Sequence, residues 1–183
     1  ALEMLAAMAP LNDRLEQEAK EEGRKHIPLR VGLGLNSGEC VVGNMGTAQR
    51  MDYSVLGDTV NTAARLEGQS KNYGVGIVIG EETEAKVDNV FATLELDLIA
   101  VKGKAEAVRI HTILGREDML QQQDFLALKK QHTAMLEAYR TQDWSKARGL
   151  IKDCRSADGS LGDLYDMYDE RIEYFTENPP EPD

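Results

Sequence analysis

The sequence predicts an α+β domain, a sheet with helices on one face, followed by an all-α extension. Apolar residues at helical spacing open the 183-residue chain and give way to extended runs rich in Val and Leu, and helical spacing returns from Glu117 onward. Hydrophobic residues make up 42% of the chain and charged residues 29%, which suits one sizeable domain or a domain plus an appendage. We therefore divide the chain into residues 1–115 and 116–183.

Charge and cysteine content exclude several classes of function. The formal charge of −11 argues against nucleic acid as a partner, because neutralising phosphates needs clustered Lys and Arg. Cys40 and Cys154 lie far apart and lack metal-ligand spacing, which indicates the reducing cytoplasm and no disulfide framework. No apolar run reaches the ~20 residues of a membrane helix, although a parent protein anchored in a membrane is compatible with this.

The amino end is predicted to be helical. Apolar residues recur at helical spacing from Leu2 to Leu15, and the pattern ends at Gly23. Pro10 lies inside this pattern, so we predict a bend near Ala9, because the proline ring clashes with the preceding turn. Since the pattern is already running at the first residue, we expect the chain to be cut from a longer protein.

Extended runs follow. Residues 29–35 and 39–42 flank "NSG" at 36–38, which predicts a β-hairpin. A strand over 53–56 leads into a helix from Thr59 to about Lys71, with Asp58 as its N-cap. The remaining elements of this part are a buried strand "VGIVIG", a short helix "EETEAKV", and a second hairpin in which "FATLELDLIAV" is joined through "KGKAEA" to "VRIHTIL".

The carboxyl-terminal part is predicted to be three helices. "AYRTQDWSKARGLI" predicts two antiparallel helices that resemble a single tetratricopeptide-type unit, with Tyr139 and Trp144 packed at the turn. One such unit cannot bury its own apolar face, so we expect it to dock on the sheet or on a partner chain. A third helix covers Leu161–Phe175, and its acidic residues predict a solvated face.

Asn61 and Arg65 are the candidate site residues of the first helix after the extended runs. At roughly 100° per residue, positions four apart point about 40° apart around a helix, so both side chains can reach one target. From spacing alone, a solvated helix surface is the simpler interpretation. The glycines of "GLGLNSG" do not open a helix, so they do not predict a dinucleotide-binding loop.

Three segments carry a family resemblance. "RVGLGLNSGECVVGNMG", "MDYSVLGDTVNTAARLEGQS" and "VKGKAE" resemble the second half of the catalytic domain of class III nucleotidyl cyclases. The resemblance covers about residues 1–115, and "GDTVNTAARLE" is its most specific element. It implies a truncated ferredoxin-like cyclase sheet and a homodimer with active sites at the interface. The implied reaction converts ATP or GTP to a 3′,5′-cyclic nucleotide plus pyrophosphate in a signalling protein.

The resemblance also implies the roles of four residues. Asn61 would hold the ribose and Arg65 would stabilise charge at the reacting phosphorus, which suits a reaction that depends on positioning and charge neutralisation. Lys102 would bind the triphosphate as a flexible point charge. Ser54 occupies a base-selecting position, where its hydroxyl can donate or accept, and we favour ATP over GTP.

The resemblance implies an incomplete site. The two carboxylates that bind Mg²⁺ or Mn²⁺ in the family lie upstream of the helix that opens this sequence, so we assign no metal ligand to this chain and expect it to be inactive alone. The carboxyl-terminal helices also resemble a tail of some bacterial cyclases with a membrane anchor. Two alternatives stay open, namely a guanylate cyclase and a non-catalytic cyclase-like module for dimerisation or regulation.

Overall fold

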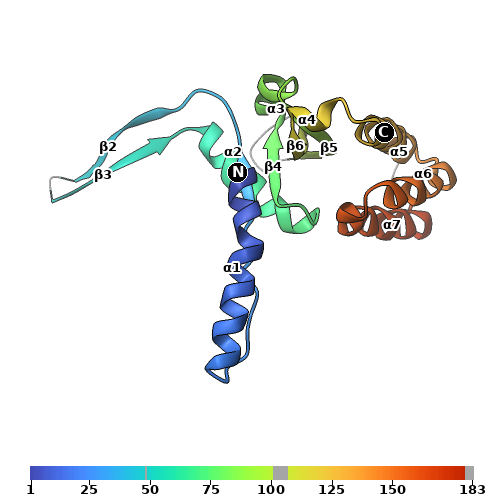
Figure 1. Ribbon diagram of the computed structural model, residues 1–183. Helices are drawn as coiled ribbons and strands as arrows, with labels where there is room; N and C mark the ends of the chain where they lie inside the picture. Colours follow the sequence, from blue (N-terminus) through green and yellow to red (C-terminus); the bar gives the residue numbers. More distant parts are fainter. Residues whose placement is uncertain (48, 101–106, 180–183) are drawn as a thin grey trace.

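The computed structural model describes residues 1–47, 49–100 and 107–179. A small sheet lies at the centre, a long two-stranded ribbon and a rod-like helix project from it, and the carboxyl-terminal helices lie on the opposite side from the ribbon (Figure 1). The elements in chain order are α1 (Leu2–Glu21), β1 (Leu33–Leu35), β2 (Val41–Thr47), β3 (Arg50–Leu56), α2 (Asp58–Asn72), β4 (Ile77–Gly80), α3 (Glu81–Val87), β5 (Phe91–Ala100), β6 (Ala107–Arg116), α4 (Glu117–Leu120), α5 (Gln123–Arg140), α6 (Trp144–Ala157), the 3₁₀ turn η1 (Gly159–Leu161) and α7 (Gly162–Glu177).

The central sheet has four strands in the order β1-β4-β6-β5. β1 runs parallel to β4, with Leu33 opposite Ile77, and β6 is antiparallel to both β4 and β5. The predicted hairpin of "FATLELDLIAV" with "VRIHTIL" is therefore confirmed as β5–β6. The sheet and its helices confirm the α+β class.

The other predicted hairpin is wrong. Residues 33–35 pair with β4, whereas β2 pairs with β3 in an uninterrupted antiparallel register from Val41↔Leu56 to Thr47↔Arg50. The "NSG" segment does not reverse the chain into a hairpin, because it is bound to the start of α2. There Asn36 donates through Nδ2 to the carbonyl oxygen of Thr59 at 3.2 Å. Periodicity predicts strands, but it does not choose between distant partners.

Helix α2 packs closely on β1. Thr62, Leu66 and Ser70 form its buried face. Gly34 of β1 lies against the helix backbone, and a Cβ at this position would come within 2.2 Å of the carbonyl oxygen of Ala63. Any side chain there would push the helix away, so this glycine sets the distance between β1 and α2.

Helix α1 continues through Pro10 as a single element, so the proline does not divide it. The loss of one i→i−4 hydrogen bond is tolerated within a helix of this length. The returning chain is tied to the helix by the Asn12 side chain, which donates to the Leu29 carbonyl at 2.9 Å and accepts from the Leu29 amide at 2.8 Å.

The carboxyl-terminal helices dock on the sheet. α5 and α6 form the predicted antiparallel pair, and Trp144 packs edge-to-face on Tyr139 and stacks on Phe175. A single buried core joins Leu94 and Leu96 of β5 to the three helices. The likeness to a tetratricopeptide unit and the division after residue 115 stay predictions. Within the described residues no helix has the length and apolarity to cross a bilayer.

Candidate functional site

Helix α2 presents the two predicted site residues. Asn61 is exposed and Arg65 is half-buried, one helical turn further along. Within the described residues, Nη1 of Arg65 is buried and has no hydrogen-bond partner. An unsatisfied buried donor is costly, and a guanidinium N–H pairs best with an anionic oxygen. This nitrogen is enclosed by the protein itself, so an anion from outside would meet the rest of the half-buried guanidinium.

The start of α2 is shaped by a strand-to-helix turn. β3 ends at Leu56, and Gly57 follows with φ of +154°. The amide groups of Val60 and Asn61 both donate to the Gly57 carbonyl, at 3.2 and 3.3 Å. Gly57 therefore takes the N-cap position, and Asp58, predicted to be the N-cap, is the first residue of the helix instead. A glycine suits this turn because side chains rarely tolerate that φ.

The structure describes three of the four predicted residues, and their roles stay predictions. Ser54 lies on β3 opposite Gly43, and every residue of β3 is exposed. Its hydroxyl is therefore open to solvent on the projecting ribbon, several residues before α2. Lys102 lies outside the described residues, so its predicted place near the triphosphate stays a prediction.

Family comparison agrees with the motif in α2. Residues 1–115 match the family described as "Adenylate and Guanylate cyclase catalytic domain". This match covers more than half of the chain and includes the whole "GDTVNTAARLE" segment. The chain belongs to the class III nucleotidyl cyclase family.

Individual relatives support this membership. An adenylate cyclase of Anabaena cylindrica is 35% identical over 120 residues, which are 62% of this chain and 23% of that protein. Adenylate cyclase 1 of Rhizobium meliloti is 31% identical over 106 residues, or 57% of this chain and 16% of that protein. This cyclase chain thus spans less than a quarter of these relatives.

A solved structure resembles the fold as well. The crystal structure of the adenylyl cyclase CyaB from P. aeruginosa matches with a TM-score of 0.50 and 36% identity. The match covers 62% of this chain and 57% of that one. The fold likeness therefore extends over more than half of each chain.

The described residues of this cyclase chain offer no set of ligands for the metal ions of the family. In residues 1–47, 49–100 and 107–179, no group of three or more His, Cys, Asp or Glu side chains is placed to hold a metal ion. Asp166 and Asp169 on the acidic face of α7 instead pair with Arg155 at 2.7 and 3.2 Å. We therefore derive no catalytic step through a metal bound by this chain.

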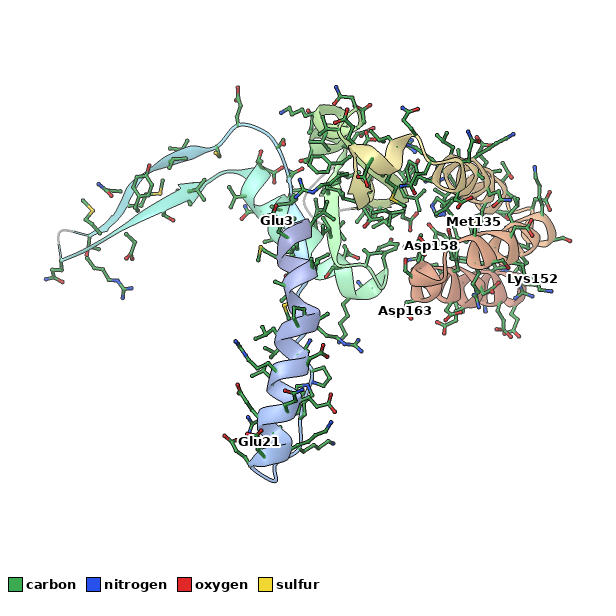
Figure 2. All side chains as sticks on the ribbon, viewed as in Figure 1. Glu3, Glu21, Met135, Lys152, Asp158 and Asp163 are labelled. Carbon is green, nitrogen blue, oxygen red and sulfur yellow. The ribbon has the colours of Figure 1, made fainter. Side chains whose placement is uncertain are left out.

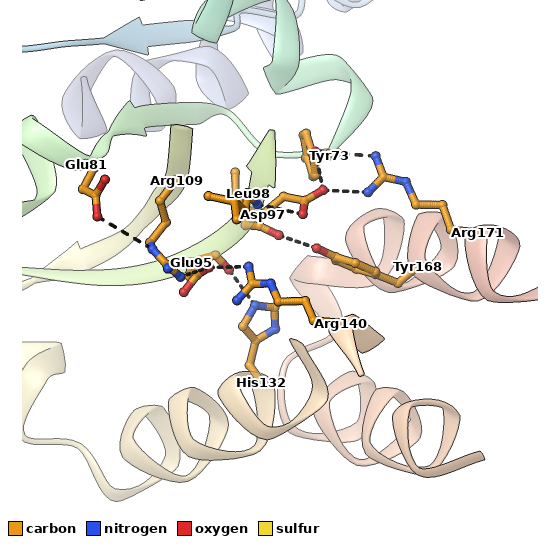
Figure 3. Close-up of polar contacts among 11 residues, drawn as sticks. Tyr73, Glu81, Glu95, Asp97, Leu98, Arg109, His132, Arg140, Tyr168 and Arg171 are labelled. Atoms are coloured by element: carbon orange, nitrogen blue, oxygen red, sulfur yellow. Dashed lines mark hydrogen bonds and ion pairs between the residues drawn. The ribbon is translucent and has the colours of Figure 1, made fainter. Parts of the chain in front are cut away.

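A second polar cluster, which sequence reasoning missed, joins β5 to the carboxyl-terminal helices (Figure 3). The carboxylate of Glu95 accepts from Arg109 of β6 and Arg140 of α5, each at 2.5 Å. Asp97 accepts from Tyr73 and from Arg171 of α7, each at 2.7 Å. The signal was present in the sequence, because "FATLELDLIAV" carries two carboxylates in an otherwise apolar strand.

His132 of α5 lies in the same junction. Its Nε2 lies 2.6 Å from the Glu95 carbonyl oxygen, and its Nδ1 lies 3.2 Å from the Tyr165 hydroxyl. Because a carbonyl only accepts, Nε2 carries the proton and Nδ1 accepts from tyrosine. Burial lowers the pKa of His132 to about 4, so the ring is neutral at pH 7. It is a structural residue of the core.

Proposed function

We propose that this chain supplies Asn61 and Arg65 to the active site of an adenylate cyclase, which converts ATP to 3′,5′-cyclic AMP and pyrophosphate. The supporting observation is the exposed Asn61 one helical turn before the half-buried Arg65, whose guanidinium has one nitrogen, Nη1, without an acceptor among the described residues. An oxygen of the α-phosphate would accept from that guanidinium. The curated relatives named as adenylate cyclases favour ATP, and guanylate cyclase activity is the alternative.

The chemistry requires positioning more than covalent assistance. The ribose 3′-oxygen attacks the α-phosphorus, and a new bond forms between them. The bond from the α-phosphorus to the oxygen that bridges to the β-phosphorus breaks, its electron pair leaves with pyrophosphate, and the 3′-hydroxyl proton passes to solvent. Asn61 would hold the ribose through its amide, and Arg65 would stabilise the charge that builds on the phosphate oxygens. Lys102 would hold the triphosphate.

We place the rest of the site outside this chain. The ribbon of β2 and β3 exposes the large apolar side chains of Val41, Tyr53 and Leu56, and such exposure suits contact with a partner. A homodimer with its sites at the interface would cover it, and the Mg²⁺ or Mn²⁺ ligands would come from residues upstream. We place the domain in the cytoplasm, in keeping with the free thiols of Cys40 and Cys154.

Two variants of the longer protein that contains this chain test the proposed roles. We expect Arg65→Ala and Asn61→Ala each to lower kcat for cyclic AMP formation by about 10² to 10³, the range for loss of one preorganised contact to the transition state. Matched controls lie at the other end of the helix, where Lys71→Ala and Asn72→Ala should retain activity. Unchanged kcat in Arg65→Ala and Asn61→Ala would favour the non-catalytic module.

The chain alone provides a separate test. We expect the purified chain to form no cyclic AMP from ATP in the presence of Mn²⁺, because the metal ligands are assigned to other residues. Turnover above that of the Arg65→Ala variant of the same chain would contradict this assignment.

Base selection is tested at Ser54. We expect Ser54→Ala in the longer protein to reduce the ratio of kcat/KM for ATP to that for GTP by about 3- to 10-fold, the worth of one neutral hydrogen bond. The ratio of initial rates with the two nucleotides in competition measures it. An unchanged ratio would remove Ser54 from the base site.

A further inference from the structure

The outermost strand of the sheet is covered by side chains of the carboxyl-terminal helices. β5 stands at one end of the strand order, so one row of its backbone groups has no neighbouring strand among the residues that the structure describes. His132 donates through Nε2 to the Glu95 carbonyl, and the Tyr168 hydroxyl donates to the Leu96 carbonyl, both at 2.6 Å. These two contacts take the place of strand pairing. The helices are therefore joined to the sheet by directional bonds as well as by apolar packing.

Arg171 of α7 lies at the centre of a polar junction with Asp97 of β5 and Tyr73 (Figure 3). Its Nη1 donates to Oδ2 of Asp97 at 2.7 Å, and the same oxygen accepts from the Tyr73 hydroxyl at 2.7 Å. The guanidinium also lies over the rings of Tyr73 and Tyr168, at 5.5 and 5.7 Å from their centroids. The Asp97 side chain is only 13% exposed. A partly buried pair with this many directional contacts holds its members in one geometry.

Tyr73 connects this junction to α2. It is the C-cap residue of that helix, its amide donates to the Gln69 carbonyl at 3.1 Å, and the residue is 1% exposed. Arg65 precedes it by eight residues, or about 12 Å along the helix axis. A helix is stiff over so short a length, so the orientation of its carboxyl end constrains the side chains about two to three turns before it. The crossing at Gly34 holds the middle of the helix.

We propose that Arg171, acting through Asp97 and Tyr73, is a positioning residue that sets the orientation of α2 and thereby the placement of Asn61 and Arg65. The carboxyl-terminal helices then belong to the functional unit. The importance of placing Asn61 and Arg65 rests on the proposed function. The effect of Arg171 on the orientation of α2, however, can be measured without catalysis.

The first experiment follows the two side chains directly in this chain. NMR spectra of the ¹⁵N-labelled chain report the side-chain amide of Asn61 and the Nε–Hε group of Arg65. We expect both signals to shift in Arg171→Ala, and to shift less in Arg171→Lys, which keeps the charge but loses the planar fork. Tyr73→Phe removes only the hydroxyl and should also shift them. Lys152→Ala, at the exposed position of α6 labelled in Figure 2, is the control that leaves them in place.

The second experiment uses the longer protein. After correction for the folded fraction, we expect Arg171→Ala to lower kcat on the order of 10-fold with KM for ATP within about twofold, since a small misplacement of a catalytic group costs rate rather than ground-state binding. Arg171→Lys should restore part of kcat, and Lys152→Ala should leave it unchanged.

The outcomes separate the two proposals. Unchanged Asn61 and Arg65 signals in the Arg171 and Tyr73 variants would overturn the positioning proposal, whatever happens to kcat. Shifted signals with unchanged kcat would uphold positioning and count against the catalytic roles of Asn61 and Arg65. If Arg171→Ala does not fold, Arg171→Lys and Tyr73→Phe decide the matter, because each keeps most of the packing.

Discussion

Two antiparallel hairpins of this cyclase chain differ sharply in what surrounds them. β2 and β3 pair residue for residue over seven positions, yet Val41, Tyr53 and Leu56 are 67%, 77% and 58% exposed. β5 and β6 pair over ten residues with two register shifts, and Leu94 and Leu96 are buried. Figure 2 shows the ribbon side chains standing away from the rest of the chain, while those of the carboxyl-terminal helices crowd together.

The difference in burial between the two hairpins shows that regular strand pairing and packing against the rest of the chain are separate properties. Alternating apolar residues suffice to pair strands, but an isolated two-stranded ribbon is at best marginally stable in water. The irregular hairpin is the buried one, because the carboxyl-terminal helices pack on β5 at one of its register shifts, between Glu95 and Asp97. Packing there outweighs regular pairing. The regular ribbon instead exposes apolar side chains that a partner would cover.

Hydrogen exchange should reveal the largest contrast. In the chain alone we expect backbone amides of β6 to exchange about 10³-fold more slowly than those of β3, because core strands open only with global unfolding of several kcal/mol. Mass spectrometry of peptides covering the two strands measures the ratio. Equal protection would mean that the ribbon is stabilised in the isolated chain, which contradicts the comparison.

Truncation of one apolar side chain in each hairpin, buried in one and exposed in the other, sharpens the comparison. Leu96→Ala should lower the free energy of unfolding by about 2–5 kcal/mol, since the side chain is fully buried. Val42→Ala on the ribbon should change it by no more than about 0.5 kcal/mol. Urea denaturation of the chain gives both values, and similar losses for the two variants would show that the ribbon shares the core.

The pH dependence of stability tests the junction at His132. Its pKa falls from 6.5 in the unfolded chain to about 4 in the folded one, so only the unfolded state gains the proton between these values. Stability is complete above pH 6.5 and should fall as the pH drops to 4, with a contribution on the order of 3 kcal/mol. The glutamine side chain of His132→Gln does not titrate, and this variant keeps the neighbouring charged groups of Glu95 and Arg140. It therefore isolates the contribution of the imidazole.

The measurement is the free energy of unfolding of both proteins at pH 7 and pH 4. The wild-type chain should lose more stability than His132→Gln over this interval. Parallel pH profiles would show that the ring is protonated equally in both states.

The smallest effect on stability is expected at Tyr53. Tyr53→Ser removes an exposed ring, so the melting temperature of the chain should stay within about 2 °C, which corresponds to less than about 0.5 kcal/mol. In the longer protein the same change should weaken self-association, because the ribbon is proposed to lie at the dimer interface. Analytical ultracentrifugation measures this, and unchanged association would move the interface elsewhere.

Much of the secondary structure was predictable, and much of the pairing was not. The helices around "NTAARLE" and "AYRTQDWSKARGLI" follow from their spacing, as does the β5–β6 hairpin, because these signals are local. The parallel contact of Leu33 with Ile77 joins residues 44 positions apart, and no periodicity selects that partner.

For the candidate site, the sequence by itself determined the family, through the "GDTVNTAARLE" segment, and the placement of Asn61 and Arg65 one turn apart on a helix. Helical geometry requires only local hydrogen bonds, so that spacing needs no tertiary information. Only the tertiary structure decided that the Arg65 guanidinium has a buried nitrogen with no partner in the described part of the chain, and that Arg171 reaches the end of the same helix through Asp97 and Tyr73. Those contacts join segments nearly a hundred residues apart, and burial depends on what the fold brings around each group.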